Sequence, residues 1–350
     1  MSGLWVSVRV RKYEEELALA QSALIRGVVS GCQAAARACR GADESVNGGS
    51  ALPDVQSSLD SANLGNRSEP LIDRLTPHLD GHDVPALVRQ FTEDGFCVIP
   101  GLLEPEALQS LRGALAPWLG NGPLGRNVFE GTRTHRVYAM LAKDPVFADL
   151  IVHPVALAWA EHYLGSSCLL SACLAICLEP GESAQPWHTD DGHVTLAPPH
   201  DLLGVSTFWA LDDTTVDNGA TEVLPGSHRW SETDFPGVLR DQDFADDADV
   251  CGDPGAHPDA IKVVMPAGSL MIARGDLWHR GGANRSAASR RLITPQYCAG
   301  WLRPLESMLL AVPPSVAATL PQRARELLGY SIHPPFMGYS DGMHPQRVLP

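Results

Sequence analysis

Residues 169–178 read LLSACLAICL, the first and longest of a series of short apolar runs separated by Gly, Pro, Asp and Asn. The runs that follow it are residues 205–211, 221–224, 261–265, 270–273 and 292–298. Many short strands with frequent turn signals favour an all-β barrel or sandwich over an alternating α/β fold. The sequence therefore predicts a mainly β domain with a barrel core over about residues 167–300.

Helical patterns flank this core and are expected to cover its outside. Asp83 can cap a helix that Gly95 ends, and a short strand at residues 96–99 should follow. Pro105 suits the first turn of a second helix, and a further helical stretch is expected from Pro145 to Gly165, with a break at residues 153–154. A last helix is predicted at residues 321–328.

The first 70 residues differ from the rest of the chain. Residues 12–40 are Ala-rich and predict a helix, whereas residues 41–68 are dominated by Ser, Asn, Gly and Asp and predict a disordered linker. We therefore expect an N-terminal extension over 1–70 and one domain over 71–350, with the C-terminal helix and tail in 301–350.

The net charge and the hydropathy of the chain exclude some kinds of partner and of membrane segment. The net charge of −15 argues against a nucleic-acid partner or a general affinity for anionic membranes, and favours a small-molecule substrate. No apolar run reaches 18 residues, and the N-terminus lacks the apolar core of a secretory signal. We expect a cytoplasmic protein; Arg9, Arg11 and Lys12 leave organellar targeting open, although residues 14–16 are all acidic. The sequence does not specify an oligomeric state.

The eight cysteines suggest no disulfide framework. Cys173 and Cys177 lie inside the apolar run 169–178, and no second Cys pair occurs at zinc-ribbon spacing. Both are expected to behave as small buried hydrophobic residues.

A short motif, His188-Thr189-Asp190, is followed 89 residues after the aspartate by His279. Two imidazoles and one carboxylate can occupy one face of an iron ion and leave adjacent coordination positions open, as in non-heme Fe(II) oxygenases. If the motif lies in a β-strand, His188 and Asp190 point to the same side and Asp191 to the other. By itself a His-x-Asp motif also occurs by chance, often in a surface turn.

Three longer segments surround these residues: QPWHTDDGH at 185–193, NGATEVLPGSH at 218–228 and GDLWHRGGANRS at 275–286. Together with WALDD at 209–213, they closely resemble the phytanoyl-CoA dioxygenase family of Fe(II)- and 2-oxoglutarate-dependent oxygenases, from about Val84 onward. The resemblance implies a double-stranded β-helix, a cupin-like jelly-roll barrel with flanking helices. It also implies that His188, Asp190 and His279 bind the iron.

The activity implied by the resemblance is hydroxylation of an unactivated C–H bond with Fe(II), 2-oxoglutarate and O2, releasing succinate and CO2. The carboxylate of Asp190 favours hydroxylation over halogenation, because related halogenases carry a small residue there. Desaturation, epoxidation or ring rearrangement in secondary metabolism remain alternatives, as does a non-catalytic metal-binding barrel.

By resemblance, the distal carboxylate of 2-oxoglutarate meets an arginine eleven residues after the second histidine, which is Arg290. A planar guanidinium can hold a carboxylate through two parallel hydrogen bonds. Arg291 is the rival, since the sequence pattern does not fix which of the two side chains points inward. The resemblance also places Arg136 near the cosubstrate and Phe208 or Trp209 in its pocket.

Several positions near these motifs have more than one interpretation. Gly281 stands where some family members carry a serine near 2-oxoglutarate, so one hydrogen bond is missing or supplied elsewhere. His228 is an alternative distant ligand, although it follows a Pro-Gly-Ser turn signature, and His193 and His200 lie in a loop that could touch substrate. The acidic segment 231–260, if it closes over the site, would favour a neutral or cationic substrate; otherwise it is a solvated loop.

Overall fold

The computed structural model describes residues 69–120, 124–231, 234 and 257–350, which all lie within the compact unit Gln56–Pro350. The predicted helix and linker before residue 69, most of the acidic segment 231–260, and Cys32, Cys39 and Cys251 fall outside this range. Among the described residues, no helix has both the length and the apolar character needed to cross a bilayer.

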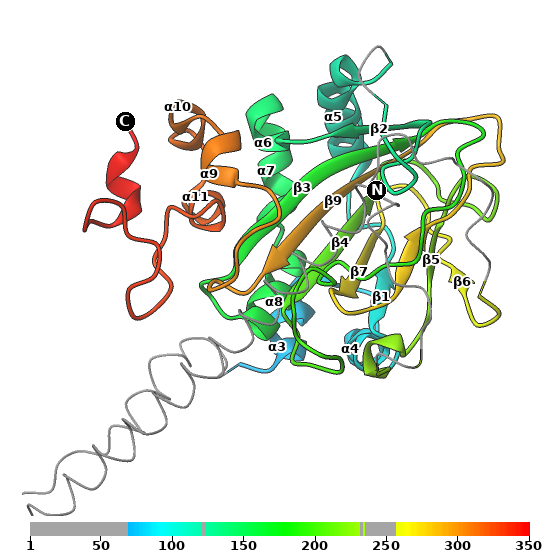
Figure 1. Ribbon diagram of the computed structural model, residues 1–350, viewed down its shortest axis with the longest axis horizontal. Coiled ribbons are helices and arrows are strands. Elements are labelled where there is room, and N and C mark those ends of the chain that lie inside the picture. Colours follow the sequence, from blue (N-terminus) through cyan, green and yellow to red (C-terminus); the bar gives the residue numbers. More distant parts are fainter. Residues whose placement is uncertain (1–68, 121–123, 232–233, 235–256) are drawn as a thin grey trace, which may run out of the picture. The chain divides into compact units, whose positions relative to one another are not determined.

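Two antiparallel sheets form the centre of the described unit (Figure 1). The larger sheet has the strand order β1-β7-β4-β9-β3-β2, and the smaller one has the order β6-β5-β8. The strands are β1 (Phe96–Ile99), β2 (Thr134–Val137), β3 (Leu169–Leu178), β4 (Gly204–Ala210), β5 (Thr221–Val223), β6 (Ile261–Lys262), β7 (Leu270–Arg274), β8 (His279–Gly281) and β9 (Arg290–Cys298). From β4 the chain passes to the smaller sheet for β5 and β6 and then alternates between the sheets through β7, β8 and β9, which is the jelly-roll arrangement.

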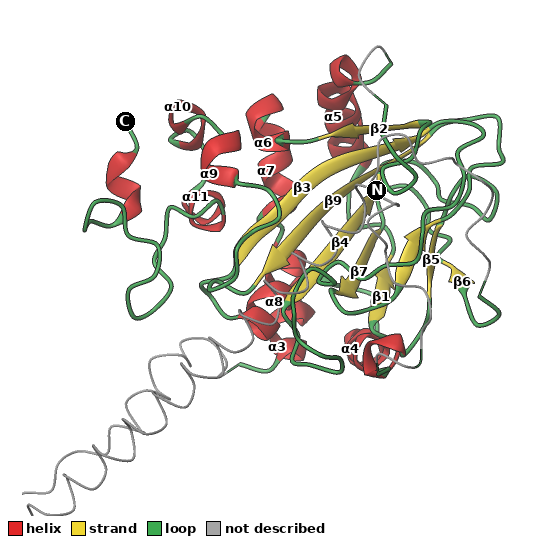
Figure 2. Cartoon of the chain, in the orientation of Figure 1, coloured by secondary structure: helices red, strands yellow, loops and turns green. Residues whose placement is uncertain are grey.

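Helices pack on the outer face of the larger sheet, as Figure 2 shows. They are α3 (Leu71–Leu75), α4 (Val84–Asp94), α5 (Pro105–Leu115), α6 (Met140–Lys143), α7 (Ala148–Ile151), α8 (Pro154–Leu164), α9 (Met308–Ala311), α10 (Pro314–Ala317) and α11 (Gln322–Leu327). The Asp83 side chain caps α4 by accepting from Ala86 N, and Gly95 ends that helix at φ 87°, a left-handed conformation that glycine adopts without strain.

Apolar residues fill both sides of the larger sheet. On the outside, Trp159 of α8 and Trp209 of β4 belong to the core that the helices cover. On the inside, Phe208 and Ala210 of β4 pack with Val223 of the smaller sheet in a second core. Because side chains alternate along a strand, neighbours on β4 serve opposite faces of the sheet.

The predicted mainly β fold is confirmed, and most predicted strands are found within a residue or two of their expected positions. Two strands were not predicted: β2, which holds Arg136, and β8, which begins at His279. Both are only three or four residues long and lack an apolar run, so they carry too weak a pattern to detect. The predicted run 261–265 contributes only the two residues of β6.

Candidate metal centre

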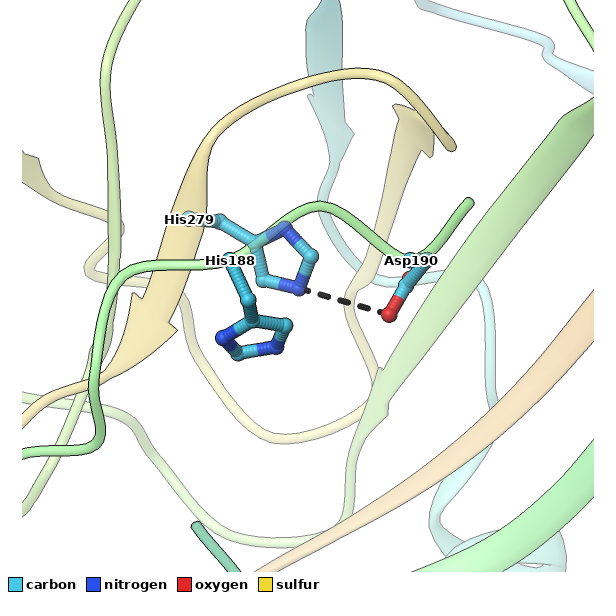
Figure 3. A group of neighbouring side chains, drawn as sticks. All are labelled: His188, Asp190 and His279. Carbon is cyan, nitrogen blue, oxygen red and sulfur yellow. Dashed lines mark ion pairs between the residues drawn. The ribbon is translucent and has the colours of Figure 1, made fainter. Parts of the chain in front are cut away.

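His188, Asp190 and His279 lie together, with one ligand atom of each within 4.8 Å of the others (Figure 3). His279 begins β8, and its backbone exchanges two hydrogen bonds with that of His188, at 2.9 and 3.0 Å. The expectation that His188 and Asp190 share a β-strand is wrong: His188 forms an isolated bridge, and Asp190 lies in the turn that follows. The turn, rather than strand alternation, brings the carboxylate toward the imidazoles, and Asp191 also lines the cavity there.

Backbone carbonyls fix the orientation of both imidazole rings. The Nδ1–H of His188 donates to Pro186 O at 2.9 Å, and that of His279 donates to Leu277 O at 3.0 Å. Since a carbonyl can only accept, each Nε2 carries the lone pair and faces the other two side chains. A hydrogen bond from the second ring nitrogen is the usual way to orient a metal-binding histidine.

The Asp190 carboxylate is held in a similar way. Ser206 of β4 donates its hydroxyl proton to Asp190 Oδ2, while Oδ1 lies 3.7 Å from His279 Nε2. One carboxylate oxygen is therefore engaged by the protein and the other is directed to the histidines. This arrangement favours a carboxylate that binds a metal through one oxygen.

The three side chains fit a divalent metal ion. Ligand atoms about 2.1 Å from one ion lie no more than about 4.2 Å apart, and the 3.7 Å between His279 Nε2 and Asp190 Oδ1 satisfies that limit. Burial, together with the neighbouring His279, lowers the pKa of His188 to about 3. His188 is thus neutral at physiological pH and its Nε2 lone pair is available to a metal.

The triad faces a cavity of about 1050 Å³ inside the barrel. Arg290, the first residue of β9, also lines this cavity although its side chain is only 1% exposed. Its Nη2 donates to Gly219 O, but Nε and Nη1 have no hydrogen-bond partner. Burial lowers the pKa of Arg290 to about 10, so the guanidinium stays charged at neutral pH with two donors free for an anion.

Arg291 points to the other side of β9. Its backbone N and Nε donate to Asp212 Oδ2 at 2.9 and 2.8 Å, and its Nη2 donates to Asp212 Oδ1 at 2.7 Å. This hydrogen-bonded carboxylate raises the pKa of Arg291. The register of β9 against β3, which pairs Arg290 with Leu178 and Arg291 with Cys177, decides which arginine enters the barrel.

The remaining predicted cosubstrate residues divide between two locations. Phe208 lines the cavity with its ring 5.7 Å from that of His279, in an edge-on contact. Trp209 does not line it: the side chain is fully buried on the helical side of β4, 5.0 Å from the ring of His153, because strand alternation sends the two aromatic residues opposite ways. Arg136 lines the cavity and donates to the carbonyls of Phe129 and Glu130 at 3.0 and 2.8 Å.

Two residues that the sequence did not single out also belong to the site. Gln185 accepts from Gly281 N at 2.9 Å and donates to Phe129 O at 2.6 Å, and its Oε1 lies 2.8 Å from where a Cβ at Gly281 would stand. The space of the serine found in some relatives is therefore filled by a glutamine side chain. Thr221 of β5 lines the cavity as well. Only the pairing of distant segments reveals these positions.

The three other histidines near the motifs line the cavity but are not part of the triad. His228 lies in the short 3-10 turn Ser227–Arg229, and burial lowers its pKa to about 4. His193 and His200 lie in the loop after the first ligands, and His200 Nε2 is 3.8 Å from Asp191 Oδ2.

Residues 91–292 match the sequence profile of the family described as phytanoyl-CoA dioxygenase. "Dioxygenase af480" of Aspergillus fumigatus is 30% identical over 198 residues, which cover 56% of this chain and 59% of that protein. "Dioxygenase aneA" of Aspergillus aculeatus is 30% identical over 240 residues, 63% of this chain and 73% of that protein. The chain thus spans less than two thirds of the first relative and nearly three quarters of the second.

Solved structures that match this chain include the non-heme α-ketoglutarate-dependent epimerase SnoN from nogalamycin biosynthesis, with 19% identity and a TM-score of 0.49 over 61% of this chain and 80% of that one. HygX from Streptomyces hygroscopicus, with nickel and 2-oxoglutarate bound, has 19% identity and a TM-score of 0.49 over 63% of this chain and 88% of that one.

Proposed function

The chain belongs to the phytanoyl-CoA dioxygenase family, and we propose that it is an Fe(II)- and 2-oxoglutarate-dependent dioxygenase that hydroxylates an unactivated C–H bond of a small molecule. The observation that carries this proposal is the shared cavity: a two-histidine, one-carboxylate centre and the partly unpartnered guanidinium of Arg290 line the same space. A metal that binds a keto acid and a buried cation that binds its far carboxylate need such a common space.

His188, Asp190 and His279 would hold the iron, and Arg290 would hold the distal carboxylate of 2-oxoglutarate. Phe208 and Thr221 border the space around Arg290 and the triad. Gln185 has one amide hydrogen engaged with Phe129 O, so its second hydrogen is available to the cosubstrate.

When bound, iron, 2-oxoglutarate and O2 supply the oxidising power for the C–H bond, and 2-oxoglutarate leaves as succinate and CO2. The protein's own residues fix the geometry. The carbonyls of Pro186 and Leu277 hold the two imidazoles in one tautomer, and the Ser206 hydroxyl holds one oxygen of Asp190.

The carboxylate of Asp190 supports hydroxylation as the outcome, because halogenation needs a small residue at this position. We place the reaction in the cytoplasm and exclude nucleic acid as a partner. The net charge of −15 supports the absence of a nucleic-acid partner. The cytoplasmic location is supported by five buried free cysteines within the described residues, since reducing compartments preserve thiols (Cys97, Cys168, Cys173, Cys177, Cys298).

The test is to add Fe(II) and then 2-oxoglutarate to the full chain without oxygen. A metal-to-ligand charge-transfer absorption is expected in the intact protein and should disappear in Asp190→Ala. His228→Ala serves as a matched control, because that histidine lines the cavity without joining the triad and should leave the absorption in place. An intact protein that shows no such absorption would overturn the proposal. If the absorption appears but no succinate forms after O2 and a broad panel of substrates are added, the result would favour a non-catalytic metal-binding barrel.

A further inference from the structure

The cavity is lined by more carboxylates than cations: Glu130, Glu182, Asp190, Asp191, Asp276 and Glu306 against Arg136 and Arg290. Most of these carboxylates have partners of their own. Glu130 pairs with Arg126 at 2.7 Å, Asp276 with Arg274 at 2.7 Å, and Glu182 accepts from Thr134 Oγ1 at 2.6 Å. With Asp190 assigned to the metal, Glu182, Asp191 and Glu306 accept no hydrogen bond from a lysine or arginine side chain among the described residues, and Glu182 is already held by Thr134 and two backbone N–H groups.

Glu306 lies in the segment after β9, beyond the residues that match the family profile. Its backbone N donates to Ser171 O at 2.7 Å, and its carboxylate accepts from Ala139 N at 2.7 Å and from Cys173 N at 3.5 Å. These contacts fix the carboxylate beside β3. Among the described residues Glu306 forms no ion pair within 4 Å; its partial burial raises its pKa, which the two backbone donors and the more distant Lys143 only partly oppose.

Asp191 provides a second, independent sign of missing positive charge. Its side chain lines the cavity, the residue is 6% exposed, and Oδ2 has no hydrogen-bond partner. The Nε2 of His200 lies 3.8 Å from this oxygen, beyond hydrogen-bond distance. Burying a carboxylate oxygen without a partner is costly, so Asp191 favours a ligand that brings positive charge, and the half-buried Glu306, whose two partners are uncharged backbone N–H groups, favours one as well.

The face that β3 presents to the cavity is apolar, whereas Thr294 and Gln296 of β9 add two polar groups to the same wall. Ala172, Leu174 and Ile176 of β3 point into the cavity, and Leu305 and Val194 border it as well. Apolar walls with a small number of placed polar groups are typical of a small-molecule site. The ligand that fits is therefore mostly apolar.

Strand register places the two ends of this site at the same level of the sheet. At one end, Ser206 of β4 holds Asp190 and pairs with Gln296 on β9. Gln296 pairs in turn with Ala172 on β3. At the other end, Glu306 contacts the backbone N of Cys173, the residue after Ala172. With neighbouring strands about 4.8 Å apart, Glu306 lies on the order of 10 Å from Asp190.

We propose that the substrate is a largely apolar molecule with a protonated amine, and that Glu306 binds this amine while a carbon on the order of 10 Å away faces the metal centre. The inference rests on the proposed function, because it names the substrate class of the same cavity. It also disfavours a phosphate-bearing acyl-CoA, whose negative charges would meet Asp191 and Glu306 in a site of low dielectric.

The experiment measures calorimetric binding of three probes to the full chain without added metal: decylamine, decanol and decanoate, each below its aggregation concentration. They share one apolar chain and differ in the charge of the head group. We expect decylamine to bind at least tenfold more tightly than decanol, whereas the affinity for decanoate should depend on Arg290 and stay unchanged in Glu306→Gln. Glu306→Gln should remove most of the decylamine advantage and leave decanol within about twofold, whereas the exposed Glu93→Gln, which changes the net charge equally, should alter neither.

Glu306→Gln keeps the oxygen that accepts from Ala139 N but turns its NH2 toward Cys173 N, so a purely structural role of Glu306 predicts equal changes in the affinities for decylamine and decanol. Equal affinity for decylamine and decanol in the unmodified chain overturns the proposal even if the variant does not fold. Because no iron or cosubstrate is present, this failure is separate from the absence of a charge-transfer absorption, which would overturn the proposed function instead.

Discussion

Arg290→Ala should weaken 2-oxoglutarate binding by about two orders of magnitude. Arg290 is 1% exposed, and its Nε and Nη1 have no partner in the protein, so a carboxylate that enters the cavity can accept from both. A hydrogen bond to a charged group contributes about 1.5 kcal/mol at the lower end of its range, and two contribute about 3 kcal/mol. At 1.4 kcal/mol per tenfold change, the Kd should rise by roughly 140-fold.

Arg291→Ala is the matched control, because it removes the same side chain one position further along β9. Arg291 is bound to Asp212 on the other face of the sheet, so its loss should leave the Kd for 2-oxoglutarate within about twofold. Arg290→Lys should lie between the two, since it keeps a positive charge but loses the planar pair of donors.

The assay titrates 2-oxoglutarate into each Fe(II)-loaded variant without oxygen and follows the charge-transfer absorption. Thermal melting of the three variants checks that each is folded at the assay temperature. Equal Kd values for Arg290→Ala and the unmodified chain would refute the assignment of Arg290 as the carboxylate-binding residue. A larger rise in the Kd for 2-oxoglutarate in Arg291→Ala than in Arg290→Ala would refute the inference from the β9 register that Arg290 is the arginine that enters the cavity.

Three further predictions concern positioning and stability. Ser206→Ala should weaken Co(II) binding about 10-fold, because Asp190 loses the hydroxyl that holds its second oxygen; an unchanged Co(II) titration would count against this role. Burial, reinforced by His78, lowers the pKa of His153 to about 4. Between about pH 6.5 and 4 the His153 imidazole is therefore protonated in the unfolded chain and neutral in the folded one. Up to about 3 kcal/mol of folding stability is lost as the pH falls through that window. His153→Asn should flatten the pH dependence of urea unfolding there, and an identical slope in both proteins would contradict it. Trp209→Ala should lower the free energy of unfolding by about 3 to 5 kcal/mol without changing the Kd for 2-oxoglutarate, and a changed Kd would show that Trp209 reaches the cavity.

The fold class followed from local patterns in the sequence. Each long strand of the larger sheet is an apolar run bounded by turn residues, as in β3, and the helix α4 has its capping residue and its terminal glycine written in the chain. The short strands β2 and β8 left no such pattern, because they are defined by their pairing partners and not by their own composition.

The site was predictable only where residue type restricts the chemistry. Two histidines and an aspartate at His188, Asp190 and His279 point to a metal centre because few side chains bind metals well. The means of assembling it was not predictable, since Asp190 reaches the histidines from a turn and not from a strand. Gln185 was not singled out because glutamine is common in polar loops and only the contact with Gly281 gives it a role.

The sequence by itself determined that this protein is a mainly β domain with a triad of metal-binding residue types and an arginine pair at the correct spacing. Tertiary structure alone decided which members of adjacent pairs line the cavity: Arg290 and not Arg291, and Phe208 and not Trp209. The physical reason is that neighbouring residues of a strand point to opposite faces, and the register with distant strands decides which face is the interior. Glu306 was likewise not identifiable from the sequence. Its carboxylate enters the cavity only because its segment hydrogen-bonds to β3, more than 130 residues earlier in the chain.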